Sequence, residues 1–153
     1  MEVEWTILGD YAHIAEGKLY LQGGGWERLN VNTGFPVRQQ IGIAQSILVP
    51  WDETNQPIDL EIEIQTADGA SLLKGKNQVK VGRPPDHPPG MPIRAMSASN
   101  IFFEFKEPGS YVLLSTLNGA EAKRTPFYII PGPLLAMKQH QAGQGGGDPP
   151  TPQ

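Results

Sequence analysis

Residues 58–65 read Ile-Asp-Leu-Glu-Ile-Glu-Ile-Gln and are the clearest structural signal in the chain. Apolar and polar residues alternate strictly, and successive side chains of a β-strand point to opposite faces of a sheet. The pattern therefore predicts a strand with one face on a hydrophobic core and the other face in water. We interpret the polar row of Asp59, Glu61 and Glu63 as a solvated face or as protection of a sheet edge. A metal site is the weaker interpretation, because a flat row does not converge several oxygens on one cation.

Short apolar runs separated by turn residues continue this pattern along the first 130 residues. No stretch carries a sustained apolar stripe of helical period, so we expect an all-β fold of eight to nine strands. The strand patterns lie at 4–8, 11–15, 18–22, 26–31, 37–49, 58–65, 101–105, 111–117 and 123–130, with weaker candidates at 72–74 and 78–81. The architecture that suits this spacing is an antiparallel β-sandwich of the immunoglobulin-like kind.

Turn residues mark the corners of this predicted sandwich. Glu16-Gly17 and Asn118-Gly119 each predict a tight hairpin, and Asn-Gly suits a type I′ turn because both central positions of that turn favour positive φ. The stretch around Gly109 and Tyr111 resembles the entry to a late strand in immunoglobulin-like domains, where a tyrosine hydroxyl binds nearby backbone. We therefore predict that role for Tyr111.

The length and composition exclude several classes of protein. A chain of 153 residues allows one domain, which we place at residues 1–130, and the absence of cysteine excludes disulfide scaffolds, cysteine-bound zinc and thiol nucleophiles. With 12 Lys and Arg against 16 Asp and Glu, the formal net charge is −4, so we expect no nucleic-acid partner.

The start of the chain lacks the pattern of a signal peptide, and no apolar run approaches a membrane span of about 18 residues. We expect a cytoplasmic protein without membrane contact.

Two segments outside the strand patterns are candidates for partner contact. Residues 83–92 contain five prolines, counted from the sequence, and predict an exposed, stiff loop that crosses between sheets or docks a partner through His87, Pro88 and Pro89. Residues 131–153 are rich in Pro, Gly and Gln and predict a flexible tail. Within it, Leu134, Leu135 and Met137 belong to a short apolar run that could dock on a neighbour.

The opening of the chain has a recognisable pattern. Residues 9–12 read Gly-Asp-Tyr-Ala, and residues 16–29 contain Gly-Lys-Leu-Tyr and Gly-Gly-Gly-Trp. Together with the Pro-Gly-x-Tyr turn at 108–111, the Asn-Gly hairpin and the strand at 126–130, they resemble a bacterial family of small all-β proteins classed as a domain of unknown function. The resemblance covers about residues 4–130. It implies a β-sandwich and brings no assigned activity.

The residues required for catalysis do not assemble in the sequence. His13, His87 and His140 are far apart, and none has the spacing that places two metal ligands on one helix face. No serine lies in a Gly-x-Ser-x-Gly context. A phosphate cradle at the three glycines 23–25 is also disfavoured, since no helix pattern follows them. We expect no catalytic residues, cofactor or metal, and interpret the glycines as a bulge or a close backbone approach.

These observations favour a non-catalytic protein–protein interaction module, working as a subunit of a larger assembly through a protein partner or self-association. The alternative is a sandwich that binds a small ligand or a carbohydrate with surface aromatics. Trp5, Trp26 and Trp51, together with Tyr11 and Tyr20, would supply its platform. Tryptophans in sandwiches are more often core residues between the sheets. We therefore prefer the interaction module to a sandwich that binds a small molecule.

Overall fold

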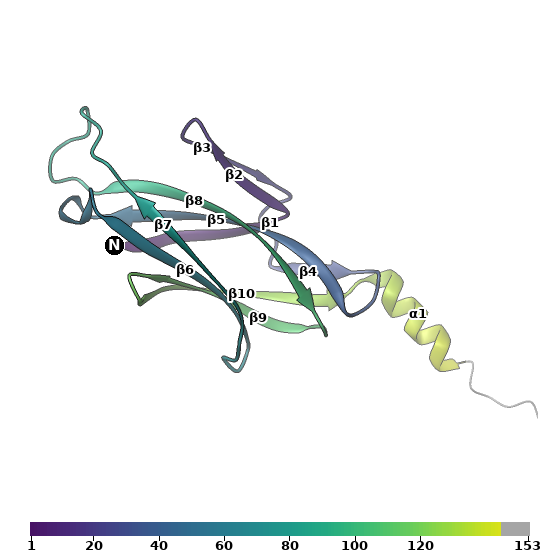
Figure 1. The fold of residues 1–153 in the computed structure, drawn as a ribbon. Helices are drawn as coiled ribbons and strands as arrows, with labels where there is room; N and C mark the ends of the chain where they lie inside the picture. Colours follow the sequence, from purple (N-terminus) through teal and green to yellow (C-terminus); the bar gives the residue numbers. More distant parts are fainter. Residues whose placement is uncertain (145–153) are drawn as a thin grey trace, which may run out of the picture.

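A computed structural model of the chain describes residues 1–144, which form three β-sheets and one terminal helix (Figure 1). The first sheet has three strands in the order β1-β5-β8, all antiparallel: β1 (Glu2–Gly9), β5 (Val37–Val49) and β8 (Ile93–Phe105). The pairing of β5 with β8 is unbroken over all thirteen residues of each strand.

The second sheet has five strands in the order β4-β10-β9-β6-β7. They are β4 (Arg28–Val31), β6 (Pro57–Thr66), β7 (Ser71–Lys80), β9 (Gly109–Leu117) and β10 (Ala120–Pro131). Its ladders are antiparallel except for the pairing of β4 with β10, which is parallel. The chain crosses from the first sheet to the second after β5, through the short 3-10 helix η1 (Trp51–Glu53), and returns through the loop between β7 and β8.

A hairpin of β2 (Tyr11–Ala15) and β3 (Lys18–Gln22) forms the third sheet and lies against the outer face of the first (Figure 1). Two hydrogen bonds join its backbone to the side chain of Asn100: Ala12 N donates to Oδ1 at 2.9 Å, and Nδ2 donates to Ala12 O at 2.7 Å. Gly42 lies beneath the crossing, where an added Cβ would stand 2.7 Å from the Tyr11 backbone. Only glycine permits this close approach.

The hydrophobic core lies between the three-stranded and five-stranded sheets. Alternate residues of β5 and β6 enter it, as the two-residue period of a strand requires. An aromatic cluster joins the sheets, because the Phe105 ring of β8 lies 5.0 Å from that of Tyr111 and 6.2 Å from that of Phe127. The core side chains with the lowest exposure are Ile41, Ile43, Ile47, Val49, Ile58, Leu60, Ile64, Phe105, Leu113, Phe127 and Ile129.

The predicted all-β fold is confirmed, and the strands at 11–15, 18–22 and 37–49 have the expected bounds. Ten strands form within residues 1–144, against the eight to nine expected, and one ladder is parallel. The two weak candidates at 72–74 and 78–81 belong to one strand, β7, which ends at Lys80. The strand expected at 101–105 is the end of the longer β8.

The predicted hairpin turns are also confirmed. Glu16 and Gly17 have φ of 51° and 71°, and Asn118 and Gly119 have φ of 50° and 81°, as type I′ geometry requires. The Tyr111 hydroxyl donates to the carbonyl oxygen of Glu107 at 2.8 Å, which is the backbone contact expected of it. Burial of that hydroxyl raises the pKa of Tyr111, and the nearby Glu107 carboxylate adds to the shift.

The expected flexible tail is instead helical over its first part. Residues 133–144 form α1 (Pro133–Gln144), which extends away from the sheets (Figure 1). Proline is favoured at the first position of a helix, and the following residues 134–142 contain neither glycine nor proline. The overall Pro and Gly content of the segment concealed this run of good helix formers. The rest of the predicted tail, residues 145–153, lies outside the described part of the chain.

Candidate functional site

A groove of about 470 Å³ runs between β7 and β8, where the edges of the two large sheets face each other. Its apolar floor is formed by Leu60, Ile62 and Ile64 of β6, whose side chains point into the core. Its sides are residues 73–77 of β7 and 99–102 of β8. We refer to this feature, with the two strand edges that flank it, as the β7–β8 groove.

Small and polar residues keep the β7–β8 groove unfilled. Gly75 pairs with Ile62 in the β6–β7 ladder, and an added Cβ there would meet nothing within 4 Å. On the opposite side, Ser99 occupies the core-facing position of β8 that pairs with Ile43 of β5. Larger side chains at these two positions would close the space between the sheets, as they do elsewhere in the core.

Both strands of the groove have one edge without a partner among residues 1–144. β7 and β8 are the terminal strands of their sheets, so each presents unpaired backbone N–H and C=O groups along one side. β8 also presents apolar side chains to solvent, with Met96 40% exposed and Phe102 60% exposed. An unpaired edge beside an apolar groove is the feature that strand-adding partners recognise.

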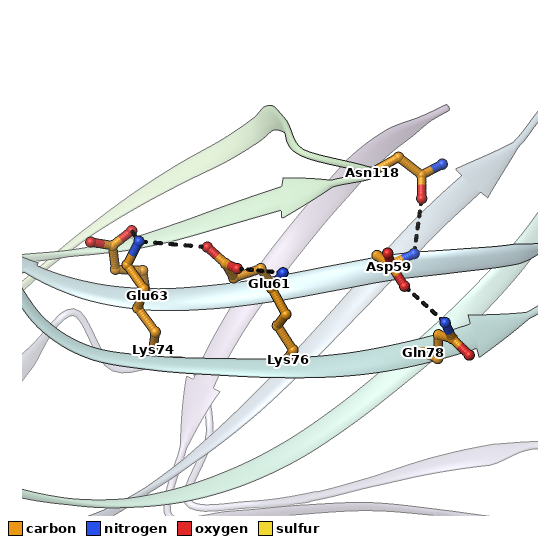
Figure 2. A network of polar contacts seen from close by, with 7 residues as sticks. All are labelled: Asp59, Glu61, Glu63, Lys74, Lys76, Gln78 and Asn118. Atoms are coloured by element: carbon orange, nitrogen blue, oxygen red, sulfur yellow. Dashed lines mark hydrogen bonds and ion pairs between the residues drawn. The ribbon is translucent and has the colours of Figure 1, made fainter.

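The outer face of β6 and β7 carries a ladder of opposite charges (Figure 2). Lys74 Nζ lies 3.5 Å from a carboxylate oxygen of Glu63 and 3.8 Å from one of Glu61, and Lys76 Nζ lies 3.4 Å from Glu61. A hydrogen bond from Ser71 lowers the pKa of Glu63, and Gln65 and Lys74 act in the same direction. Two members of the expected carboxylate row, Glu61 and Glu63, are therefore paired with lysines of the neighbouring strand, while Asp59 accepts a hydrogen bond from Gln78 at 3.0 Å. The row does not protect a sheet edge, because β6 lies between β9 and β7.

The predicted partner loop is the crossover between the sheets, as one of its two interpretations proposed. The His87 ring stacks on Trp51 with centroids 6.2 Å apart, and the guanidinium carbon of Arg83 lies 4.3 Å from the same indole centroid. These contacts attach the loop to η1, while Pro88 and Pro89 are exposed. Of the predicted tail contacts, α1 presents Leu134 and Met137 to solvent, at 62% and 64% exposure, and Leu135 is half-buried.

The three tryptophans lie in separate places and are all half-buried. Trp5 is in β1, Trp26 packs edge-on against Phe127 at 6.3 Å, and Trp51 lies beneath the crossover loop. The aromatic residues that do gather are on the exposed face of the β2–β3 hairpin. There the His13 ring stacks on that of Tyr20 at 4.9 Å and lies 5.6 Å from that of Tyr11.

Sequence reasoning missed the β8 side of the groove. The inward positions 95, 97 and 99 hold only Ala and Ser, so after Ile93 the inward face lacks the large apolar residues that identify a strand. The charge ladder between β6 and β7 could have been predicted from the sequence. Carboxylates at 59–63 and lysines at 74–80 lie on either side of an Asp-Gly turn, which is the pattern of a hairpin with opposite charges on its two strands.

No cluster of three or more His, Asp or Glu residues that could hold a metal ion occurs in residues 1–144. No helix within the same range is long and apolar enough to cross a bilayer.

One protein-family model covers most of the chain. The search among curated proteins finds no match. The family of unknown function DUF6941 matches residues 4–130, which are the residues of the three sheets almost from end to end. This match covers most of the 153 residues. The chain therefore belongs to the family of unknown function DUF6941.

Proposed function

We propose that this protein is a non-catalytic protein–protein interaction module that binds partners by strand addition at the β7–β8 groove. The observation that supports the proposal is the pairing of an apolar groove of about 470 Å³ with two unpaired strand edges. In strand addition, main-chain hydrogen bonds to the edge provide affinity, and pockets for alternate side chains provide specificity. The groove offers both elements in one place.

The chemistry of the groove defines the kind of segment that it would accept. An added strand directs every second side chain inward, toward the floor of Leu60, Ile62 and Ile64. Those side chains should be apolar, because the floor offers no polar partner. Lys74 and Lys76, the lysines of β7 that line the groove, are already paired with Glu61 and Glu63, so the outward side chains need no particular charge.

Selection from a random peptide library by the dilute purified protein tests this proposal. The wild-type protein should enrich peptides with apolar residues at alternate positions. Gly75→Trp should fill the groove and weaken their binding at least about tenfold, because the Cβ at Gly75 has open space around it. Gly82→Trp is the matched control, since its Cβ also meets nothing within 4 Å but lies outside the groove. Failure to enrich peptides, or equal binding by Gly75→Trp, contradicts the proposal.

A second candidate function is supported by the aromatic face of the β2–β3 hairpin. Tyr11 and Tyr20 are 40% and 46% exposed and flank His13, so three rings lie on one accessible surface. Flat aromatic surfaces stack on the apolar faces of sugar rings. A glycan-binding assay should then give a signal that Tyr20→Ala removes and Tyr128→Ala, an exposed tyrosine on β10, retains.

Two finer expectations belong with these proposals. An immunoglobulin-like classification of the scaffold is supported by the core between two sheets and by the Tyr111 contact at the start of β9, and an experimental structure compared across sandwich families would test it. A cytoplasmic location is compatible with a sequence that has no cysteine, and fractionation of native cells would test it.

A further inference from the structure

We infer that the strand added to β8 is β8 of a second copy of this chain, running antiparallel and centred on Ser99. The inference rests on the proposed function, which makes the β7–β8 groove the contact surface, and it names the partner. It is carried by two independent features: β8 lacks the protection that the other sheet edges have, and its sequence is complementary to itself about Ser99.

The unprotected character of β8 is clear from its length and composition. It has thirteen residues, pairs with β5 without a bulge, and contains neither proline, glycine nor lysine. Between Arg94 and Glu104 it carries no charged side chain. Long, regular and apolar edges of this kind pair readily with another chain, and natural proteins usually avoid them.

The terminal strands at the other three edges of the two large sheets carry such protection. β4 is only four residues long. β1 is interrupted by a bulge at Glu4, between the pairs formed by Val3 and Trp5. β7 carries Lys74, Lys76 and Lys80, an internal glycine, and an irregular register at its start. Short length, bulges and lysines are recognised means of blocking edge pairing. Of the four edge strands, only β8 has none of them, which indicates that this edge has a partner.

The sequence of β8 is complementary to a second, antiparallel copy. Centring the pair on Ser99 places residues equally distant from Ser99 opposite one another. Arg94 then lies opposite Glu104 of the second copy, and this charge pair occurs at both ends because the pairing is symmetric. Between them, Met96 lies opposite Phe102 of the second copy, so the two exposed apolar side chains of the strand cover each other.

The outward direction of these side chains is consistent with the pairing. Arg94, Met96, Phe102 and Glu104 share the face opposite to the core-facing residues Ile93 and Phe105. Opposite charges directly across strands stabilise a pair, and a methionine sulfur makes favourable contacts with an aromatic ring. Arg94 already donates to Glu4 through Nε and Nη2, at 2.5 and 2.7 Å, and a guanidinium has five N–H donors. Further donors therefore remain for Glu104 of the second copy.

The resulting assembly is a closed two-fold dimer in which the two three-stranded sheets become one continuous sheet. A two-fold strand pair uses the same surface on both copies, so it ends at the dimer and does not propagate into a fibre. The β2–β3 hairpin does not prevent this pairing through its contacts with β8, because it binds Asn100 from the outer face of the sheet.

Charge exchange at the two ends tests the register. Arg94→Glu places like charges opposite Glu104 in both pairs of a homodimer, and Glu104→Arg does the same with two positive charges. We expect each variant alone to dissociate at concentrations at least about tenfold higher than the wild type in sedimentation equilibrium. An equimolar mixture of the two variants should recover dimers, because every pair then joins opposite charges.

A single cysteine provides a second test that does not depend on these charges. The chain has no cysteine, so Ser99→Cys introduces one thiol. The Cα atoms of directly opposed strand residues lie about 4.5–5.5 Å apart, within the range of a disulfide, and oxidation should give a covalent dimer. Met96→Cys is the exposed control, since its copies are separated by six residues of strand, about 20 Å.

The outcomes separate this inference from the proposed function. A protein that is monomeric at all concentrations, a dimer insensitive to charge exchange, or equal cross-linking of Met96→Cys overturns the pairing of β8 with itself. If such a protein still binds library peptides in a manner that Gly75→Trp abolishes, the proposed function stands and its partner is a foreign segment. If it binds neither peptides nor itself, both proposals are wrong. Recovery of dimers in the mixture together with selective cross-linking of Ser99→Cys supports the inference.

Discussion

Glu4 illustrates how one residue combines local geometry and electrostatics. It occupies the bulge of β1, so its carboxylate reaches across β5 and accepts hydrogen bonds from Arg94 and from the Ser46 hydroxyl, the latter at 2.6 Å. The Arg94 hydrogen bonds, followed by the Ser46 bond, lower the pKa of Glu4 from 4.5 to about 2. Between these two pH values, the Glu4 carboxylate is therefore ionised in the folded protein and protonated in the unfolded chain.

Glu4→Gln should reduce the sensitivity of the protein to acid. Because the folded pKa is depressed, the contribution of Glu4 to stability is fully present above pH 4.5 and is lost as the pH falls toward 2. The midpoint of thermal unfolding, measured between pH 6 and 2, should fall less steeply in the variant than in the wild type. Asp86→Asn, in the exposed crossover loop, is the control and should leave the slope unchanged. Parallel pH profiles for wild type and Glu4→Gln would contradict the assignment.

At the scale of elements, the attachment of the β2–β3 hairpin depends on a glycine beneath it. A Cβ at Gly42 would stand 2.7–2.8 Å from backbone atoms of Tyr11 and Ala12, which cannot move without displacing the hairpin. Gly42→Ala should therefore cost about 1–3 kcal/mol of unfolding free energy, as overpacking does. Urea unfolding measures the change. Gly75→Ala, where the Cβ meets nothing, should stay within about 0.5 kcal/mol of the wild type. Equal effects of the two substitutions would exclude close packing as the cause.

The terminal helix makes a different prediction, because α1 extends away from the sheets with its apolar residues exposed. A chain ending at Gly132 keeps the hydrogen bond from Gly132 N to Val31 O at 2.7 Å, which closes the β4–β10 end of the sheet. We expect its unfolding free energy to lie within about 0.5 kcal/mol of the full chain. The far-UV signal of helix should be lost. A large drop in stability would show that α1 packs on the sheets.

At the scale of the whole molecule, the aromatic cluster couples the two large sheets. Phe105 is fully buried and contacts Phe103 of its own strand as well as Tyr111 and Phe127 of the other sheet. Phe105→Ala should cost about 3–5 kcal/mol, and the remaining protein should still unfold in one transition. Coincident near-ultraviolet and far-ultraviolet curves in urea test both points. Phe102→Ala, on the same strand but 60% exposed, should change the stability of dilute protein by less than about 0.5 kcal/mol.

The parts of the fold that the sequence predicted well share a local cause. The strand at 58–65 follows from alternation alone, and the turns at 16–17 and 118–119 follow from residues that tolerate positive φ. The first half of β8 was missed because its inward residues are small, and their burial depends on neighbours distant in the sequence. The helix at 133–144 was missed because the composition of the whole tail outweighed the run of helix formers at its start.

The candidate site was less accessible to sequence reasoning than the fold. The loop and tail residues His87 and Met137 were conspicuous by composition, yet the groove is built from Gly75, Ser99 and Phe102, none of which stands out locally. Their significance comes from the order of strands in the sheets, which joins β8 to β5 across more than forty residues of sequence. Pairing partners at this separation leave no periodic signal.

By itself, the sequence determined that this protein is built from strands, where the main hairpin turns lie, and which faces of the strands meet the core. These properties depend on neighbours two to four residues apart in the chain. Only the tertiary structure decided which strands end each sheet, that Lys74 and Lys76 pair with Glu61 and Glu63 of β6, and that, within residues 1–144, β8 keeps an unpaired edge beside an apolar groove. Those outcomes depend on long-range pairing, whose free energy comes from burying a shared core and not from any one segment.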